Sequence, residues 1–344
     1  MALRFRPMQP KDVRECVQII ANHPVIGPRY GRSIRDLPKV WLRLMGCEAV
    51  RSTIFEAAEG SHAPICCVGV TLFVNDEFVR ELKAPPSFWV GPELVQRVLR
   101  SNSPILSDRQ VQEGNSRGGL NLLVWEGCFR WGLEKNHEIQ RLAMDTFIKQ
   151  HKGFLLKEVV ASQMESIERL QWTLRTGGML WDPLAGRYEK SLKEKDPKEI
   201  IGKPHLIGVA REIVIERADS WSASWVGALF DYQPPRFGFS RSEQRLLEAA
   251  LAGESGTDRE LAESLAVSLP TIKKMWLSIY RRVNDHQPGT IRDCVPVEVT
   301  ERGKEKRRPL LTYLREHPEE LRPASQKLLG QQSLVAKRIH RVRA

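Results

Sequence analysis

The sequence predicts an α/β domain with a mixed sheet and helices in its first two thirds, then an all-α domain and a basic tail. Three observations predict this. Apolar runs of strand length alternate with helical spacing up to residue 190. Two adjacent prolines in DYQPPRFGF (231–239) forbid helix continuation and indicate a boundary. Beyond them, up to residue 286, the apolar residues recur only at helical spacing.

The first half of the α/β domain opens with a helix and then reads as strands. KDVRECVQIIANH (11–23) has apolar residues at helical spacing, after an opening strand. STIFEAAEG (52–60) and APICCVGVTLFV (63–74) predict two strands around a Gly60-Ser61 turn. PELVQRVLRSN (92–102) predicts a helix that ends at an Asn.

The second half alternates strands with helices. GLNLLVWEGCF (119–129) is a nearly continuous apolar run and predicts a buried strand. HEIQRLAMDTFIKQHKG (137–153) predicts an amphipathic helix, and FLLKEVVAS (154–162) a strand after it. SIERLQWTLRTGG (166–178) predicts a helix closed by two glycines. IIGKPHLIGVAREIVIER (200–217) predicts one or two further strands.

These patterns divide the chain into four parts. We expect a sensor-like α/β domain over 1–190, an extension and linker over 191–235, an all-α domain over 236–286, and a basic tail over 287–344. A chain of 344 residues with 41% hydrophobic residues can support two such domains.

The all-α domain reads as three short helices. SRSEQRLLEAALAGE (240–254) begins with a capping-box pattern, Ser240 with Glu243, and TDRELAESLAV (257–267) gives a second helix. Ser268 can cap a third helix, in which one apolar stripe recurs at steps of four, three and four: Ile272, Trp276, Ile279 and Val283. Two helices joined by about three residues describe a helix-turn-helix, whose outer face here carries cations.

This block resembles the LuxR-type helix-turn-helix of bacterial transcription regulators. The matching segments are FSRSEQRLL (239–247), ELAESLAVS (260–268) and TIKKMWLSIYRRV (271–283). Ser242 and Arg245 stand where the family usually has Arg and Glu, and Met275 where His is common. The alternative interpretation is a helical bundle with a solvated basic face.

The resemblance implies a sequence-specific transcription regulator whose recognition helix, 269–284, lies in the major groove of double-stranded DNA. By that matching, Ser268 and Thr271 contact phosphate, Lys273 and Lys274 enter the groove, and Lys274 reads bases. The complete set of DNA-binding residues that we expect is Ser268, Thr271, Lys273, Lys274, Leu277, Arg281 and Arg282. The family often dimerises through a fourth helix, so a homodimer is one expected partner. HQPGTIRDCVPVEV (286–299) does not read as that helix, whereas EKRRPLLTYLREH (305–317) does read as a helix.

The charge of the chain favours an anionic partner. The formal net charge is +11, and from residue 300 onwards twelve lysines and arginines face five acids. This tail could add nonspecific DNA contacts or could be a solvated terminus. A protein that binds nucleic acid through its tail alone is therefore a third hypothesis.

Neither the cysteines nor the apolar segments indicate export or a membrane. The six cysteines are scattered and form no C-x-x-C, which is typical of reduced thiols in the cytoplasm. MALRFRPMQPKDVREC has no apolar core, so we expect no secretory signal, and no apolar run reaches membrane length. The histidines show no metal spacing. We therefore expect a cytoplasmic protein with no membrane partner, no metal and no cofactor.

The α/β domain resembles a degenerate GNAT acetyltransferase fold. RFRPMQPKDVRECVQII (4–20) matches the opening strand and helix, and SIERLQWTLRTGGMLWD (166–182) a late helix and turn. That family holds the acetyl-CoA pyrophosphate on a glycine-rich loop, and GLEKNHEIQRLA (132–143) lacks those glycines. We therefore expect no enzyme and no catalytic residue, but a domain that senses a small-molecule or protein effector. The alternative is a GNAT-type acetyltransferase with an appended DNA-binding module.

Overall fold

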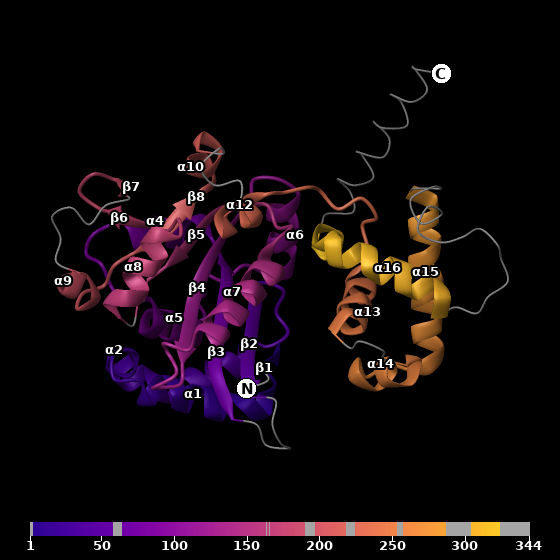
Figure 1. Cartoon of the computed structure of the whole chain (residues 1–344), viewed down its shortest axis with the longest axis horizontal. Coiled ribbons are helices and arrows are strands. Elements are labelled where there is room, and N and C mark those ends of the chain that lie inside the picture. Colours follow the sequence, from indigo (N-terminus) through magenta and orange to yellow (C-terminus); the bar gives the residue numbers. More distant parts are fainter. Residues whose placement is uncertain are drawn as a thin grey trace. The chain divides into compact units, whose positions relative to one another are not determined.

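The computed structural model describes residues 3–57, 64–162, 164, 166–189, 197–217, 224–252, 257–286 and 304–323. The chain divides into two compact units. The first comprises Met1–Gly114, Gly118–His151 and Leu156–Asp231, and the second Asn115–Arg117, Lys152–Leu155 and Tyr232–Ala344. We describe each unit separately (Figure 1).

The first unit is built on one sheet of eight strands in the order β1-β2-β3-β4-β5-β8-β6-β7. All neighbouring strands are antiparallel except β4 and β5, which are parallel. The predicted mixed sheet with helices is therefore confirmed. The strands are β1 (Leu3–Pro7), β2 (Val50–Ala57), β3 (Ile65–Val74), β4 (Leu120–Phe129), β5 (Leu156–Ala161), β6 (Met179–Asp182), β7 (Arg187–Glu189) and β8 (Ile207–Ala210).

Helices cover both faces of this sheet. On one face, five helices bury the largest apolar core, which includes Leu123, Trp125 and Cys128 of β4. They are α1 (Val13–Asn22), α2 (Ile26–Tyr30), α3 (Leu37–Leu44), α4 (Asp76–Lys83) and α5 (Val90–Leu99). The other face meets α7 (His137–His151), α8 (Ile167–Arg175), α10 (Arg211–Glu216) and α12 (Trp225–Phe230). Among the described residues, the unit also contains α9 (Pro197–Ile201) and most of α6 (Asp108–Ser116), whose last two residues belong to the second unit.

The segment 191–235, expected to be an extension and linker, contributes to the sheet. β8 pairs with β5 from Ala161↔Ile207 to Glu158↔Ala210, and it separates β5 from β6. Its apolar side chains are buried on this inner strand, which is why it belongs to the core. The further strands predicted over 200–217 are reduced to this one, because Arg211–Glu216 forms α10.

The second unit is helical. It contains α13 (Arg241–Ala252), α14 (Asp258–Ser264), α15 (Leu269–His286) and α16 (Lys304–Glu316), followed by the 3-10 turn η3 (Pro318–Leu321). The predicted stripe of Ile272, Trp276, Ile279 and Val283 is buried, together with Leu310 and Leu314 of α16. The rest of the predicted basic tail, 287–303 and 324–344, lies outside the described residues.

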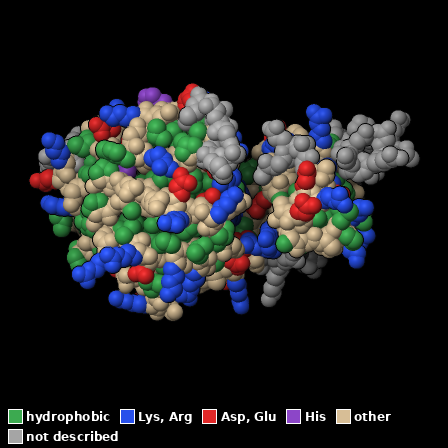
Figure 2. All heavy atoms as spheres, turned by 90° about the horizontal axis from the view of Figure 1, so that it is seen from below, with side chains coloured by type: hydrophobic (Ala, Val, Ile, Leu, Met, Phe, Trp, Pro, Cys, Tyr) green, Lys and Arg blue, Asp and Glu red, His purple; other side chains and the backbone are tan. Residues whose placement is uncertain are grey.

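Lysines and arginines are scattered over the face in Figure 2, among acidic and apolar side chains. In the described ranges, no helix is both long and apolar enough to cross a lipid bilayer. The cytoplasmic location stays a prediction.

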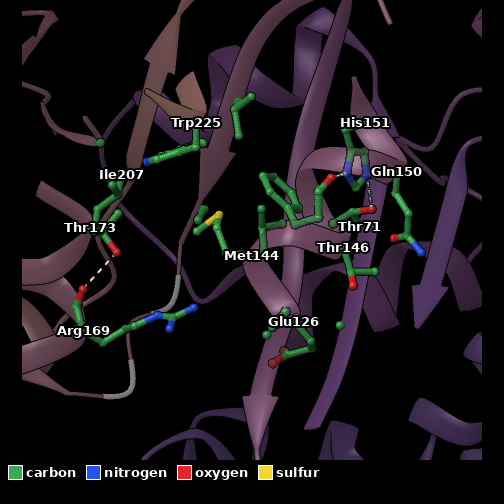
Figure 3. A pocket seen from close by; sticks show the side chains of 18 of the residues that line it. Thr71, Glu126, Met144, Thr146, Gln150, His151, Arg169, Thr173, Ile207 and Trp225 are labelled. Atoms are coloured by element: carbon green, nitrogen blue, oxygen red, sulfur yellow. Dashed lines mark hydrogen bonds between the residues drawn. The ribbon is translucent and has the colours of Figure 1, made fainter. Parts of the chain in front are cut away.

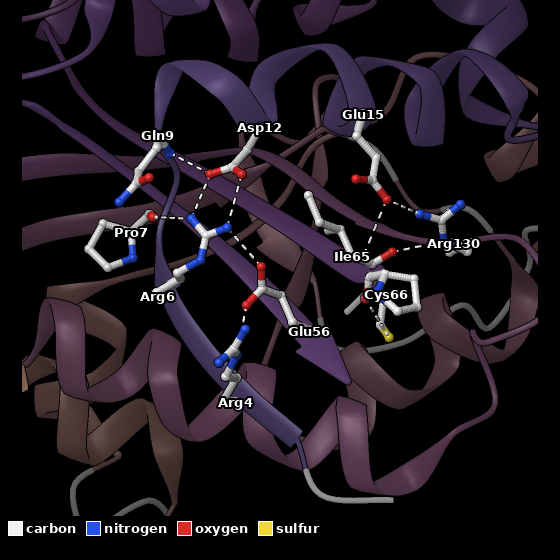
Figure 4. Close-up of polar contacts among 11 residues, drawn as sticks. Arg4, Arg6, Pro7, Gln9, Asp12, Glu15, Glu56, Ile65, Cys66 and Arg130 are labelled. Carbon is white, nitrogen blue, oxygen red and sulfur yellow. Dashed lines mark hydrogen bonds and ion pairs between the residues drawn. The ribbon is translucent and has the colours of Figure 1, made fainter. Parts of the chain in front are cut away.

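A network of charged side chains fastens β1 to α1 and β2 (Figure 4). Arg6 donates to both carboxylate oxygens of Asp12, at 2.6 and 2.9 Å, and to Glu56 at 2.7 Å. Arg4 donates to the other oxygen of Glu56, at 2.9 Å. Burial raises the pKa of Asp12, but the hydrogen bonds from Arg6 and from the Gln9 amide outweigh burial and bring that pKa below its usual value. The carboxylate is therefore charged in the folded protein at neutral pH.

Arg6→Met should lower the free energy of unfolding by about 2 kcal/mol at pH 7, because it leaves the buried Asp12 carboxylate without its charged partner. Since the folded-state pKa of Asp12 is depressed, this contribution is complete above about pH 4 and is lost as the pH falls through the folded-state value. Urea unfolding at pH 7 and at about pH 3 measures both effects.

Arg4→Met is the matched control, because Arg4 shares the Glu56 carboxylate but its side chain is 57% exposed. Its removal should cost at most about 1 kcal/mol. Equal destabilisation by the two substitutions, or a penalty for Arg6→Met that does not shrink in acid, would contradict the assignment.

Candidate functional site

A cavity of about 160 Å³ lies between the sheet and the helices α7, α8 and α12 (Figure 3). An apolar cavity of about this size accepts a molecule such as benzene. Apolar side chains form most of its wall, among them Met144, Phe147 and Ile207. Arg169 also lines it, and its guanidinium lies over the rings of Phe129 and Trp172, at 5.4 and 5.1 Å.

Two glycines create the space above the sheet. Gly69 of β3 and Gly127 of β4 lie opposite each other in the ladder, and both line the cavity. A Cβ atom added at either glycine would meet nothing within 4 Å. The opposite face of these strands is densely packed by the large core, so the open space must lie on the cavity side. Any larger residue at Gly127 would therefore fill the cavity.

The cavity lies where β4 parts from β5. The two strands pair from Leu120↔Leu156 to Val124↔Ala161, whereas β4 continues to pair with β3 as far as Phe129. The register of β3 and β4 shifts at this point, so that Trp125 is an extra residue on β4. Among the described strands, the β5 side of β4 beyond Val124 has no ladder partner.

Glu126 lines the cavity directly after the bulge and is only 2% exposed. Its carboxylate accepts a hydrogen bond from the hydroxyl of Tyr30, at the end of α2. Burial and the charge of Glu126 raise the pKa of Tyr30 well above its usual value, so the phenol stays protonated. Tyr30 therefore orients the buried carboxylate of a residue that lines the cavity.

Other polar groups of the cavity are fully engaged. His151 lies 2.7 Å from the carbonyl oxygen of Phe147 through Nδ1, and 2.8 Å from the hydroxyl of Thr71 through Nε2. A carbonyl can only accept, so Nδ1 carries the proton and Thr71 donates to Nε2. Gln150 donates to the hydroxyl of Thr53 at 2.7 Å. This side of the cavity also carries a cation, because Arg51 of β2 lines it opposite Thr71.

Two buried polar atoms of the cavity have no hydrogen-bond partner in the described part of the chain: Oγ1 of Thr146 and Nε1 of Trp225. Buried polar atoms are normally hydrogen-bonded, so each exception calls for a reason. The indole nitrogen can only donate, and the hydroxyl can donate or accept. A ligand that offers an acceptor oxygen would satisfy them.

The loop after β4 does not offer its amides to an anion. The amide of Gly132 donates to the Glu134 carboxylate, at 2.9 and 3.1 Å. Asn136 caps α7 by accepting from the amides of Glu138 and Ile139, at 3.0 and 3.1 Å. The sequence analysis predicted that 132–143 lacks a pyrophosphate cradle, and in the structure a carboxylate stands in that place.

The second unit displays most of the predicted DNA-binding residues on the outer side of α15. Lys273, Lys274, Leu277 and Arg281 are exposed, and Leu277 is 67% exposed although it is apolar. At the start of the helix, the hydroxyls of Ser268 and Thr271 lie 2.8 Å apart, and Ser268 accepts from the Thr271 amide at 3.3 Å. These residues share one exposed face. No observation tests their contact with DNA.

Arg282 is placed differently from the other cations of α15. Its Nε lies 3.3 Å from the carboxylate of Glu243 on α13, and Ser278 donates to the same carboxylate at 2.7 Å. Glu243 also accepts from the Ser240 amide at 2.7 Å, as the predicted capping box requires. Arg282 therefore joins α15 to α13. Met275, at the position where the family often has His, is half-buried.

The sequence analysis did not find the cavity of the first unit. Glu126 was an acid within an apolar strand, and Tyr30 lay in a segment without periodicity. The one available signal was the pair of glycines within strand patterns, Gly69 and Gly127, because a glycine inside a strand indicates a bulge or a space.

Three comparisons place the chain among known proteins. No family profile and no curated protein matches it. Solved structures do. The chain is similar to a GNAT-family acetyltransferase from Staphylococcus aureus Mu50, with 8% identity, a TM-score of 0.34, and 61% of this chain and 99% of that chain covered. A GNAT-family acetyltransferase from Streptococcus pneumoniae has 10% identity to this chain and a TM-score of 0.33, with 61% of this chain and 99% of that chain covered. The loading GNATL domain of CurA from Lyngbya majuscula has 13% identity and a TM-score of 0.32, with 61% of this chain and 98% of that chain covered.

These comparisons correct one expectation. We expected no enzyme, whereas the solved structures named above are GNAT-family proteins, two of them described as acetyltransferases. The expectation of no enzyme is therefore withdrawn. The LuxR-type resemblance of the second unit has no matching family profile and stays a prediction.

Thr146→Val should leave the free energy of unfolding unchanged or raise it by up to about 1 kcal/mol, because it removes a buried hydroxyl that has no partner. Thr71→Val, of the same size and in the same cavity, should lower it by about 1 to 3 kcal/mol, because it leaves Nε2 of His151 unsatisfied. Urea unfolding of both variants makes the comparison. Similar destabilisation by both would show that Thr146 has a partner that the unliganded fold supplies.

Proposed function

We propose that the chain is an acyltransferase of the GNAT type, with a DNA-binding module appended after residue 231. The observation that carries this proposal is the parting of β4 from β5 beside a cavity that Glu126 lines. The Glu126 carboxylate beside this gap could accept the proton that a bound amine loses.

The chemistry that these groups support is transfer of an acyl group from a thioester to an amine. The amine nitrogen attacks the thioester carbonyl, the carbon–sulfur bond breaks, and the sulfur leaves as a thiolate. The Glu126 carboxylate accepts the proton that the amine loses, with its orientation held by Tyr30. That proton then neutralises the thiolate. A general base of this kind contributes roughly 10²- to 10⁴-fold in rate.

The donor should be recognised by its acyl end and not by its phosphates. The Gly132 amide is already bonded to Glu134, and Asn136 occupies the first amides of α7. A diphosphate placed there would meet a carboxylate. We therefore propose an acyl thioester as the substrate and assign no residue to the phosphates of coenzyme A.

Glu126→Gln should lower kcat for acetyl transfer to a primary amine by roughly 100-fold or more, because it removes the proton acceptor. Release of free thiol from acetyl-CoA by the full chain measures the rate. S-acetylpantetheine, which lacks the diphosphate, should have a kcat/KM within about tenfold of acetyl-CoA, since a single charged hydrogen bond is worth about 1.5 to 3 kcal/mol and none is expected at the diphosphate.

Glu158→Gln is the matched control. Glu158 is a buried carboxylate on the neighbouring strand β5 and also accepts from a tyrosine, Tyr188, but it does not line the cavity. It should change stability and not kcat. Gly127→Val should abolish transfer without unfolding the protein, because it fills the cavity. Transfer that survives both Glu126→Gln and Gly127→Val would refute the proposal.

Specific binding to double-stranded DNA by the second unit is the second proposed function. It is supported by the exposed face of α15, where Lys273, Lys274 and Arg281 surround Leu277 while the opposite side is buried. An apolar side chain that is exposed among cations suits the major groove, which presents phosphates, base edges and the thymine methyl group. A transcription regulator and a homodimer stay predictions under this proposal.

The double substitution Lys273→Ala and Lys274→Ala should weaken binding to DNA selected from a random pool, and the salt slope should fall by about one for each phosphate that the variant no longer neutralises. Lys11→Ala with Lys39→Ala removes the same charge from exposed positions of the first unit and should change little. Fluorescence anisotropy at several salt concentrations gives both numbers. Equal weakening in the two double variants would indicate nonspecific attraction by net charge.

A further inference from the structure

A second cavity, of about 320 Å³, opens where β5 ends and β8 begins. Ala161↔Ile207 is the last pair of these strands, and the two polar residues that matter here lie just beyond it. Ser162 follows β5 directly, and His205 precedes β8 by two positions. Both line this cavity and neither lines the first one.

Ser162 is a buried hydroxyl without a partner. It is 2% exposed, and within the described ranges its Oγ has no hydrogen-bond partner. A buried hydroxyl left unsatisfied costs about 1 to 3 kcal/mol. A group in the cavity that accepts or donates a hydrogen bond would recover this cost.

The second buried atom without a hydrogen-bond partner in the described residues is Nε2 of His205. The tautomer of the ring decides whether this nitrogen donates or accepts. Nδ1 lies 3.0 Å from the carbonyl oxygen of Lys203, so Nδ1 carries the proton. Burial and the positive charge of Arg29 lower the pKa of His205 by more than the carbonyl oxygens of Lys203 and Ile200 raise it, so the ring is neutral near pH 7. Nε2 is then an acceptor, and it is buried with no partner in the described residues. It requires a donor.

The remaining wall favours a flat and uncharged ligand. Phe88 and Trp181 line the cavity, and the Trp181 indole is held in place by its hydrogen bond to the Lys83 carbonyl, at 2.9 Å. Lys83 is the least exposed cation of the wall, and Glu158 already neutralises it at 2.6 Å. The other two charged side chains of the wall, Glu199 and Lys203, are exposed. A charged ligand beside Ser162 and His205 would therefore find no free counter-charge there, at a high desolvation cost.

We propose that this cavity binds a neutral planar ring that bears an amide. The amide N–H donates to Nε2 of His205, its carbonyl oxygen accepts from the Ser162 hydroxyl, and the ring lies against Phe88 and Trp181. The volume of about 320 Å³ holds one ring and its amide. The proposal depends on neither acyl transfer nor DNA binding, because no residue of either site takes part.

The test uses the full chain and four related probes. Nicotinamide and benzamide should bind, whereas N,N-dimethylbenzamide, which lacks the N–H donor, and benzoate, which is charged, should bind at least about tenfold more weakly, the worth of one hydrogen bond. Titration calorimetry gives the affinities. The indole N–H resonance of Trp181, assigned with Trp181→Phe, should shift with nicotinamide, and that of Trp225 in the first cavity should not.

Ser162→Ala should weaken nicotinamide binding by about tenfold while leaving the unfolding midpoint unchanged or higher, because the removed hydroxyl has no partner in the unliganded fold. His205→Phe keeps an aromatic ring and should weaken binding to a similar degree. Thr146→Val, in the first cavity, should leave the affinity unchanged. No binding of either primary amide, equal affinity for the dimethylated probe, or an unaltered affinity in both Ser162→Ala and His205→Phe would overturn the proposal.

Discussion

The pairing of β4 is the constraint on which the first unit depends. β4 is bound to β3 along its whole length, but to β5 only as far as Val124↔Ala161. The bulge at Trp125 turns the rest of the strand away from β5, and a sheet opened in this way must be closed by something else. Helices α7, α8 and α12 close it, and because Gly69 and Gly127 supply no side chains, a cavity remains.

Some buried polar groups of the first unit are hydrogen-bonded within the fold, and others have no partner among the described residues. The pairs Tyr30–Glu126 and Tyr188–Glu158 place buried carboxylates under phenols that burial keeps protonated. Around these fixed points, Thr146 and Trp225 in one cavity, and Ser162 and His205 in the other, keep polar atoms that no described residue pairs. Unpaired polar atoms are costly, so at those that line a cavity a bound ligand would recover free energy.

Local sequence patterns predicted many of the helices and strands. The candidate sites depend instead on contacts between residues that lie far apart in the sequence. Apolar runs and helical spacing predicted β2 to β5, α7, α8 and the helices of the second unit, because burial imposes those periods directly. They did not predict that β8 enters between β5 and β6, since that strand is short and its β5 partners are more than forty residues away. Likewise Arg282 fits a cationic face by spacing, yet Glu243 holds it within the unit.

The two units differ in how their charged side chains are paired. In the first unit, the Glu134 carboxylate accepts a hydrogen bond from the Gly132 amide in the loop after β4. At the second cavity, Lys83 is neutralised by Glu158. Neither place can hold an anion without first displacing a carboxylate. In the second, Lys273, Lys274 and Arg281 are exposed on one helix, and most of the excess positive charge of the chain lies after residue 300. Under the two proposals, neutral ligands bind at the sheet of the first unit, and the helices of the second unit attract a polyanion.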